Sequence, residues 1–282
     1  MVKYDLARAD LHLHTTCSDG TYTPEEIVSI AKRSGLAAIA ITDHDTIDGI
    51  ELARKAIAKQ TDAKKNGLEL VPAIELTAQW RESELHLLGY FIDPKDDDLR
   101  RALGRLTTQR QERFVELVRR LGSVGVSLSD GDVAPYLRTP NPNRRQLAEL
   151  LVARGFVDSV REAFHKFLRD NGPLGMVECG LPVEEAVAVI RGAGGGAVWA
   201  HPAYDCRRKN LVRLCAMGLQ GIEVEYPGYR GNRVQQMREL ARDFNLVISG
   251  GSDCHGPWPY HQTVGARGIT MSELEQIRQT SK

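Results

Sequence analysis

The sequence predicts an α/β protein, an irregular (β/α)7-type barrel with an inserted helical domain. Strand and helix patterns alternate through the first third of the chain and again after Pro182. Between these regions the pattern is helical throughout. The chain has 282 residues, enough for a barrel of about 250. We therefore expect the barrel in residues 1–94 and 182–282, and the helical domain in residues 95–181.

The first third of the chain begins with a strand and a helix. Residues 9–15, ADLHLHT, alternate with the period of a strand. Thr23 and Glu26 have the spacing of a capping box around Pro24, which predicts a helix that runs to about Arg33.

Three further strands and a helix follow. Residues 36–45 form an apolar run ending in charge, as in a strand buried on both faces of a parallel sheet. A helix is expected through residues 51–60. Residues 68–78 and 84–92 are predicted strands, joined as a hairpin because few residues separate them.

The middle of the chain is predicted to be helical and basic. Helices are expected at residues 96–122, 144–155 and 160–172, with a proline-rich turn between the first two. Residues 95–170 hold 15 Lys and Arg against 11 Asp and Glu, a net charge of +4. Since the whole chain has 37 of each, the remainder carries −4, and the insertion is the electropositive part.

The last third returns to alternating strands and helices. A helix is expected at 182–195, and strands at 196–202, 221–226 and 246–256, with helices between them. About seven strands in all are typical of an irregular barrel.

Composition excludes several classes of protein. The balanced charge gives no overall attraction to long nucleic acid or to an anionic membrane. No apolar run approaches the roughly 18 residues of a membrane span, and the first residues lack a signal-peptide core. The five cysteines include no CxxC pair and are expected to be reduced thiols. We expect a cytoplasmic protein without an obligate protein partner.

Six of the eight histidines lie in or at the end of predicted strands: His12, His14, His44, His86, His201 and His255. In a parallel barrel these strand ends meet on one face, where active sites are built. His165 and His261 lie outside this pattern and are expected to be structural.

The first strand carries a potential metal site. Strand periodicity puts Asp10, His12 and His14 on one face, and two imidazoles about 7 Å apart can hold one ion. The alternative is a strand with two hydrogen-bonded histidines. Nearby, Asp43 or Asp45 could orient the ring of His44, although a helix cap or a solvated loop residue would also explain either carboxylate.

Further candidate ligands interrupt apolar strands. An unpaired carboxylate at Glu75 would be costly to bury, so it either bridges cations or pairs with an arginine. His86 and His201 interrupt similar apolar stretches. Asp253 and His255 alternate and should share a face, which turns Cys254 away. Cys17 and Cys254 are expected to pack beside the site rather than bind metal.

These segments resemble, in order, the motifs of the PHP family, named for polymerase and histidinol phosphatase domains. DLHLHTTCSDGTYTPEEI is similar to the first motif, and TDHD, the Glu75 and His86 segments, AHP and SDCHG match the rest, over roughly residues 5–95 and 180–260. The resemblance implies three divalent ions, manganese being expected and zinc or iron the alternatives. The implied ligand sets are His12, His14, Glu75 and Asp253; Glu75, His86 and His201; and Asp19, His44 and His255.

The sequence of the insertion narrows the resemblance to one subgroup of the family. NRRQLAELLVARG and FHKFLRDNGP resemble a bacterial subgroup that removes phosphate from nucleoside 3′,5′-bisphosphates and trims the 5′ ends of short RNA. That subgroup has Arg-Pro-His where this chain has Arg144-Arg145-Gln146. The implied substrate is a nucleoside bisphosphate or a short oligoribonucleotide.

A mechanism for such a site assigns roles to individual residues, as a hypothesis. Cations that share Glu75 would activate a water, and Asp253 or His255 would carry its proton. Asp19, His44 and His255 would contact the substrate phosphate through their ion. The insertion is expected to be a substrate-binding cap, with Arg101, Arg105 and Arg144 as candidates to hold a second phosphate.

Three other functions remain open at this point. An amidohydrolase barrel also begins with an HxH strand, although TDHD and SDCHG supply ligands for a third, phosphate-binding ion. A histidinol-phosphate phosphatase would stay within the family. A metal-stabilised regulatory or polymerase-accessory domain would not be an enzyme, but a full ligand set argues against it.

Overall fold

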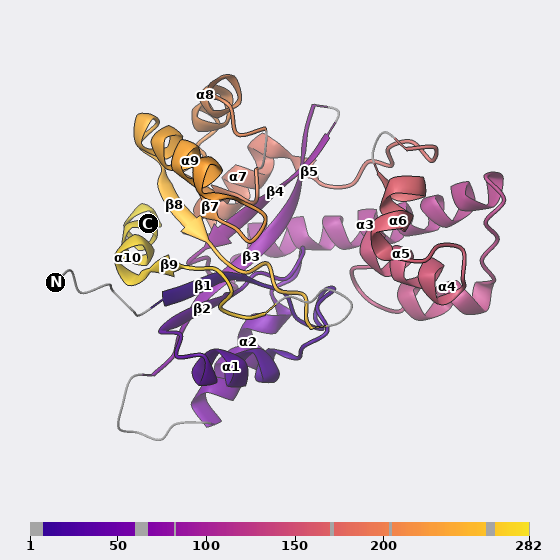
Figure 1. The fold of residues 1–282 in the computed structure, drawn as a ribbon, viewed down its shortest axis with the longest axis horizontal. Helices are drawn as coiled ribbons and strands as arrows, with labels where there is room; N and C mark the ends of the chain where they lie inside the picture. Colours follow the sequence, from indigo (N-terminus) through magenta and orange to yellow (C-terminus); the bar gives the residue numbers. More distant parts are fainter. Residues whose placement is uncertain are drawn as a thin grey trace.

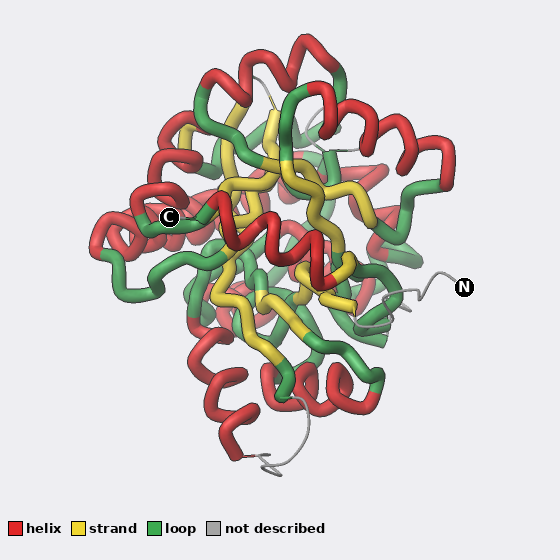
Figure 2. The backbone as a smooth tube through the Cα atoms, turned by 90° about the vertical axis from the view of Figure 1, so that its left-hand side faces the viewer, coloured by secondary structure: helices red, strands yellow, loops and turns green. Residues whose placement is uncertain are grey.

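The computed structural model describes residues 8–59, 67–81, 83–169, 172–202, 205–257 and 263–281. Within them, nine strands form one sheet in the order β8-β7-β6-β4-β3-β2-β1-β9, with β5 paired to β3. The sheet curves into a nearly closed barrel, and helices surround the strands (Figure 2). The predicted α/β barrel with inserted helices is confirmed.

The first six elements follow the sequence prediction. They are β1 (Arg8–Leu13), α1 (Pro24–Arg33), β2 (Ala38–Ile41), α2 (Asp48–Lys59), β3 (Glu69–Trp80) and β4 (Ser83–Tyr90). The capping box at the start of α1 is formed, since the Thr23 side chain accepts from the Glu26 main chain and Glu26 accepts in return. Strands β1, β2 and β3 are parallel, while β3 and β4 form the expected antiparallel hairpin.

The C-terminal part completes the sheet. It contains β5 (Leu181–Pro182), α7 (Val183–Gly192), β6 (Gly196–Trp199), α8 (Arg208–Ala216), β7 (Gly221–Glu225), α9 (Gly231–Asp243), β8 (Val247–Gly250), β9 (Ile269–Thr270) and α10 (Met271–Thr280). The seven longer strands correspond to the predicted ones. The two-residue strands β5 and β9, and helix α10, were not predicted, although a capping box of Thr270 and Glu273 marks the start of α10.

The seam of the barrel lies between β1 and the segment that follows β8. Leu13 and Cys254 form an isolated parallel bridge, and the His14 main-chain N donates to the Cys254 carbonyl oxygen at 3.1 Å. Gly251 permits this approach, because a Cβ at this position would lie 2.4 Å from the His12 main-chain nitrogen. Two segments far apart in sequence, both bearing candidate ligands, are therefore side by side.

The insertion comprises α3 (Asp97–Ser123), α4 (Asp130–Leu137), α5 (Arg144–Ala153), α6 (Val160–Ala163) and the π-helix η1 (Phe164–Leu168). Helices α4, α5 and α6 lie together at one end of the molecule, beyond the strands, and α3 runs from behind the strands to this end (Figure 1). The expected proline-rich turn between α3 and α5 is wrong for residues 130–137, which are helical. A capping box of Ser129 and Asp132 starts α4, and the helix contains Pro135.

Helix α3 joins the insertion to the barrel. Leu99 and Leu106, in its first half, pack in the core that surrounds the barrel strands. Phe114 and Leu117, farther along, pack in a separate core made by α3 to α6 and their loops. On this basis we propose that residues 95–181 form an inserted domain, with α3 shared between the two cores.

Two smaller expectations concern the cysteines and the membrane. All five cysteines are free. None of the helices in the described part of the chain combines the length and the apolar character needed to cross a bilayer.

Candidate metal centre

All nine side chains predicted to bind metal converge at one end of the barrel. They come from β1 and its following loop, the β2–α2 loop, β3, β4, and the segments after β6 and β8: His12, His14, Asp19, His44, Glu75, His86, His201, Asp253 and His255. His86 reaches the same end from an early position in its strand, because β4 runs antiparallel to β3 and β6.

Glu75 lies at the middle of the cluster and is fully buried. Its Oε1 is 3.0 Å from Nδ1 of His86 and 3.0 Å from Nε2 of His201. Its Oε2 is 3.2 Å from one nitrogen of each of three further histidines, His12, His14 and His44. The ion partners of Glu75 in the described residues are thus histidines, and the alternative of an arginine pair is wrong.

The charges of the metal-free cluster are strongly coupled. Burial alone would raise the pKa of the Glu75 carboxyl, but His44, His12 and His86 hold it well below its usual range. Burial alone would lower the pKa of His86, but Glu75 and then Glu84 raise it to about 10. A cation-binding site needs a carboxylate that stays charged. The Glu75 carboxyl, surrounded by several imidazoles, meets this requirement.

The ring of His12 has a defined orientation. Its Nδ1 donates to Oε1 of Glu223 at 2.9 Å, because a carboxylate only accepts. Its Nε2 forms a hydrogen-bond contact with Oε2 of Glu75 at 3.2 Å and lies 3.4 Å from Oδ1 of Asp253. Lone pairs and carboxylate oxygens repel one another unless a proton or a metal cation lies between them.

His14 shows the same feature. Its Nε2 lies 3.2 Å from Glu75 and 3.1 Å from Asp253, yet neither of its ring nitrogens has a hydrogen-bond partner within the described residues. Nδ1 of His44 is unpartnered in the same sense. Buried imidazole nitrogens beside carboxylates, without hydrogen-bond geometry, fit a set of metal ligands.

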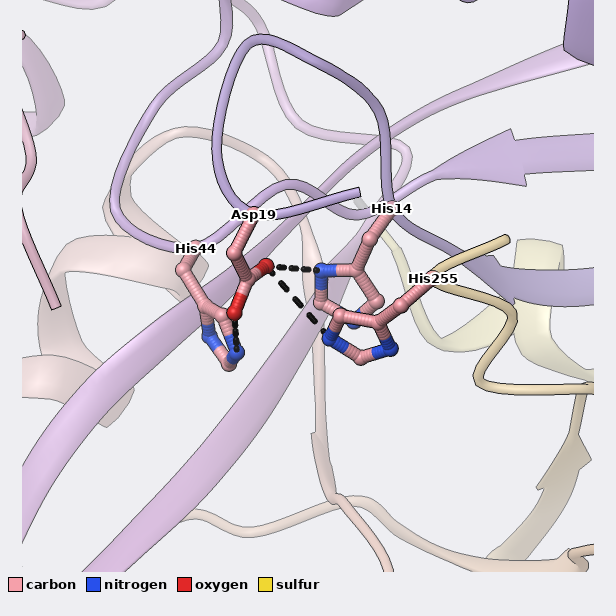
Figure 3. A group of neighbouring side chains, drawn as sticks. All are labelled: His14, Asp19, His44 and His255. Atoms are coloured by element: carbon pink, nitrogen blue, oxygen red, sulfur yellow. Dashed lines mark ion pairs between the residues drawn. The ribbon is translucent and has the colours of Figure 1, made fainter. Parts of the chain in front are cut away.

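A second part of the cluster surrounds Asp19 (Figure 3). Oδ1 of Asp19 lies 3.4 Å from Nε2 of His255 and 3.6 Å from Nδ1 of His14. Oδ2 lies 3.9 Å from Nε2 of His44. The rings of His14 and His255 are stacked with their centroids 4.0 Å apart.

Four groups of these side chains could each hold a metal ion. They are His14, Asp19, His44 and His255; His12, His14 and Asp253; His12, Glu75 and His201; and His44, Glu75 and His86. The ligand atoms within each group lie within 4.8 Å of one another. Mixed imidazole and carboxylate ligands suit divalent transition metals such as manganese, iron and zinc.

Asp43 and Asp45 do not orient the His44 ring, so that expectation is wrong. Asp43 instead accepts hydrogen bonds from Thr15 and Ser18, which holds the loop that carries Asp19. Asp45 accepts from Thr77 and from Nε of Arg110, the latter at 2.5 Å. Both carboxylates are buried and stabilise the loops that carry ligands.

A cavity of about 250 Å³, which we call the central hollow, opens onto the metal cluster. It is lined by Asp19, His44, Glu75, Glu84, His86, Arg110, Arg113, Asn143, Arg144, Arg145, Phe164, His201, Asp253 and His255. The insertion therefore contributes four arginines, an asparagine and a phenylalanine opposite the candidate ligands. Phe164 is the first residue of the π-helix, a kind of irregularity that is common at functional sites.

Of the three arginines expected to bind phosphate, the structure brings only Arg144 to the central hollow. Arg101 is exposed and pairs with Asp98, while Arg105 pairs with Glu185. Both line a different hollow on α3 and α7. The first half of α3 packs against the barrel wall, and the helix reaches the central hollow only at Arg110 and Arg113.

Sequence reasoning missed several residues at the central hollow. Arg113 is buried, and its Nη1 lies 2.8 Å from Glu84, but its Nε has no acceptor among the described residues. Asn143 is also buried; its Oδ1 accepts from the Gln146 main chain, which leaves its Nδ2 without an acceptor in the same set. Donors of this kind suit an anionic ligand.

Two other missed residues support the ligands. Glu223 is a buried carboxylate in an apolar strand, the same signal that identified Glu75. The hydroxyl of Tyr226 donates to Oδ2 of Asp253 at 2.9 Å, and no motif of the sequence indicated this contact.

The remaining predictions at the site have different outcomes. Cys254 is fully buried and packs among apolar side chains beside Leu13, turned away from the ligands as expected. His165 is exposed on the π-helix and lies outside the cluster. The prediction for His261 lies outside the described residues.

An α/β barrel with imidazoles and carboxylates gathered at one end defines a class of metal-dependent hydrolase, and comparisons with known proteins identify the family. The PHP domain profile matches residues 10–152. The chain belongs to the PHP family, whose phosphoesterases are metal-dependent.

Two relatives and one solved structure illustrate the similarity. The chain is 36% identical to the 5′-3′ exoribonuclease Rnm of Salmonella typhimurium, with 96% of this chain and 92% of that protein covered. It is 32% identical to the 3′,5′-nucleoside bisphosphate phosphatase of Chromobacterium violaceum, with 92% and 91% covered. A candidate metal-dependent phosphoesterase from Bifidobacterium adolescentis has a TM-score of 0.85 at 28% identity, with 98% and 97% covered.

Proposed function

We propose that this protein removes the 3′-phosphate of nucleoside 3′,5′-bisphosphates, giving nucleoside 5′-monophosphate and phosphate, and that it also trims the 5′ ends of short RNA. The observation that carries this proposal is the central hollow, where a candidate metal cluster faces arginines of the insertion. A substrate with one phosphate at the metals and another at the arginines fits both sides. The names of the two relatives support the same pair of activities.

We further propose that the cluster holds three divalent ions, with manganese preferred. The sets would be His12, His14, Glu75 and Asp253; Glu75, His86 and His201; and Asp19, His44 and His255. The group that contains Asp19, His44 and His255 supports the last set, and the contacts of Glu75 with His12, His86 and His201 support the other two. When bound, such ions lower the pKa of a coordinated water and neutralise phosphate oxygens.

The protein's own side chains would orient the reaction. His255 carries its ring proton on Nδ1, 2.9 Å from the Asp253 carbonyl oxygen, so its Nε2 faces Asp19. We therefore propose that His255, together with Asp19 and His44, would hold the ion that contacts the substrate phosphate. The Tyr226 hydroxyl fixes Oδ2 of Asp253, and Oδ1 of Asp253 faces His12 and His14. We propose that Asp253 or His255 carries the proton of the attacking water.

The insertion would act as the substrate-binding cap. Arg113 and Arg144 both pair with Glu84, at 2.8 and 3.0 Å, which holds their guanidinium groups beside the ligand His86. A guanidinium binds phosphate through two parallel hydrogen bonds, so these arginines are suited to a terminal 5′-phosphate. Phe164 offers a flat face for the base of the same nucleotide.

Two broader expectations accompany this proposal. We also propose that the activity needs no obligate protein partner. Nucleoside bisphosphates and short RNA are cytoplasmic substrates, so we place the activity there.

The proposal is tested by phosphate release from adenosine 3′,5′-bisphosphate, AMP and histidinol phosphate, and by ammonia release from a carboxamide, each with manganese and with chelator. We expect metal-dependent release from the bisphosphate, with AMP as the remaining product. Arg144→Ala should reduce the preference for the bisphosphate over a 3′-monophosphate, whereas Arg101→Ala should not. Faster release from histidinol phosphate, or hydrolysis of the amide alone, would overturn the proposal in favour of those alternatives.

A further inference from the structure

A second cavity adjoins the central hollow. It has a volume of about 310 Å³, and we call it the side hollow. It lies where β3 ends and β4 begins, against the end of β6 and the start of α8. Its lining comprises Trp80, Arg81, Ser83, Glu84, Leu85, His86, Arg144, Trp199, Ala200, His201, Pro202, Asp205 and Asn210.

The two hollows meet at the metal cluster. Both are lined by Glu84, His86, Arg144 and His201, and two of these four are candidate metal ligands. A phosphorus atom held at the cluster would therefore have two separate spaces beside it. One space contains the arginines of the insertion, and the other contains the end of the hairpin.

The two proposed substrates differ in how many spaces they need. In a nucleoside 3′,5′-bisphosphate the scissile phosphate is terminal, so one hollow accommodates the rest of the molecule. In RNA the same phosphate also carries the 5′ oxygen of the next nucleotide. Water adds to phosphorus, the bond to the 3′ oxygen of the first nucleotide breaks, that oxygen takes up a proton, and the phosphate stays on the second nucleotide. The second nucleotide therefore needs a space of its own.

The lining of the side hollow suits a nucleotide. The indole of Trp80 is partly exposed and meets the Trp199 ring edge-on, at 88° and 5.8 Å, which keeps the Trp80 ring in place. The guanidinium of Arg81 lies over the Trp80 ring, 4.9 Å from its centroid. Stacked indole and guanidinium planes bind bases with little sequence preference. Arg144, at the junction, is placed to contact the linking phosphate.

The charges of the side hollow also differ from those of the central hollow. The central hollow has four arginines, as a doubly charged terminal phosphate requires. The side hollow has Arg81 and Arg144 with Glu84 and Asp205, and Glu84 is already paired with Arg113 and Arg144. The four arginines of the central hollow face four carboxylates of the same lining, so the two linings differ in their number of arginines and not in net charge. Two arginines suit a base and a singly charged diester.

We propose that the side hollow binds the second nucleotide of a 5′-phosphorylated oligoribonucleotide while the first nucleotide occupies the central hollow. This inference rests on the proposed function and assigns its RNA-trimming activity to a subsite that the bisphosphate does not use. The residues that carry it are Trp80 and Arg81.

The test compares adenosine 3′,5′-bisphosphate with the 5′-phosphorylated dinucleotide of adenosine, since both yield AMP. Trp80→Ala and Arg81→Asn are the test variants. Asn is chosen because Arg81 has a φ of +61°, a conformation that asparagine adopts readily. The matched control is Arg101→Asn, an exposed arginine of a different hollow.

We expect kcat/KM for the dinucleotide to fall about tenfold in both test variants, the effect of losing one stacked base. We expect kcat/KM for the bisphosphate to stay within about twofold of the unmodified protein, which also verifies folding. The control should leave both substrates unaffected.

Equal losses for both substrates, or no loss for the dinucleotide, would overturn the inference. Hydrolysis of the bisphosphate without any hydrolysis of the dinucleotide would overturn it too, while the proposed phosphatase activity would stand. Hydrolysis of neither substrate by the unmodified protein would overturn the proposed function itself.

Discussion

Nδ1 of His12 lies 2.9 Å from Oε1 of Glu223, and both side chains are fully buried. The other carboxylate oxygen of Glu223 accepts from the His201 main-chain N at 2.7 Å. His201 has a φ of +30°, which a residue other than glycine rarely adopts. One carboxylate of β7 therefore orients the ring of one candidate ligand and the backbone of another.

Glu223→Gln should lower kcat/KM for the bisphosphate by about 10- to 100-fold, the usual effect of losing a group that orients a metal ligand. Metal content, measured by mass spectrometry after dialysis, should fall with it. Glu225→Gln is the control, because Glu225 pairs with Arg238 at 2.8 Å and is absent from the candidate metal groups. Unchanged metal content in Glu223→Gln would contradict the orienting role.

Manganese should stabilise protein that has been stripped of metal with a chelator, because the candidate metal ligands come together only in the folded chain. An ion at about 100 times its Kd adds about 2.7 kcal/mol to the free energy of unfolding. Differential scanning calorimetry should show Tm rising with manganese concentration in the unmodified protein, and much less in Glu75→Gln. A Tm that does not respond to manganese, zinc or iron would contradict a metal centre.

Arg113→Lys should raise KM for the bisphosphate about tenfold, since lysine keeps the charge but loses the planar fork. Arg113 is buried at the central hollow, with Nη1 at 2.8 Å from Glu84. Arg119→Lys is the matched control, because Arg119 is exposed on the same helix and pairs with Glu116. If steady-state kinetics gave the same KM for both variants, the assignment of Arg113 to phosphate binding would be wrong.

Arg110→Ala should destabilise the fold by about 3–5 kcal/mol, the cost of leaving one partner of a buried ion pair uncompensated. Arg110 and Asp45 are both buried, and Arg110 also donates to Thr77 at 2.8 Å. Urea unfolding measures the loss. Arg105→Ala, which breaks an exposed pair with Glu185, should cost at most about 1 kcal/mol. If the two variants lost similar amounts of unfolding free energy, burial of the ion pair would not explain the destabilisation.

Glu149 should make the metal-free protein slightly less stable at alkaline pH. Burial raises the pKa of its carboxyl from 4.5 to about 6, although Arg145 opposes the shift. The native state therefore favours the protonated form, and its contribution is complete below pH 4.5 and is lost as pH rises through about 6. Glu149→Gln should raise Tm by about 1–2 °C at pH 8 and leave it unchanged at pH 4. If Glu149→Gln raised Tm more at pH 4 than at pH 8, the predicted pH dependence would be wrong.

Much of the candidate metal centre could be predicted from local patterns. Strand alternation places His12 and His14 on one face, and the segments that follow buried strands carry His44, His201 and Asp253. Strand ends in a barrel lie on one face whatever the details of packing. Short-range periodicity and one topological rule were therefore enough to bring these residues together.

The contribution of the insertion could not be predicted in the same way. The sequence identified a long basic helix, but a helix of 27 residues carries arginines all along its length. Which of them reach the central hollow depends on where α3 leaves the barrel wall. Arg101 and Arg105 precede that point, and Arg113 follows it.

By itself the sequence determined the class of fold, the family and the set of candidate ligands, because each follows from spacing along a strand or from a motif read in order. The tertiary structure alone decided the support of that cluster by Glu223, the pairing of Asp45 with Arg110 across 65 positions, and the junction of two hollows at Arg144. These relationships join elements that are distant in the chain. They depend on packing between elements, and the periodicity of a single strand or helix carries no information about its neighbours.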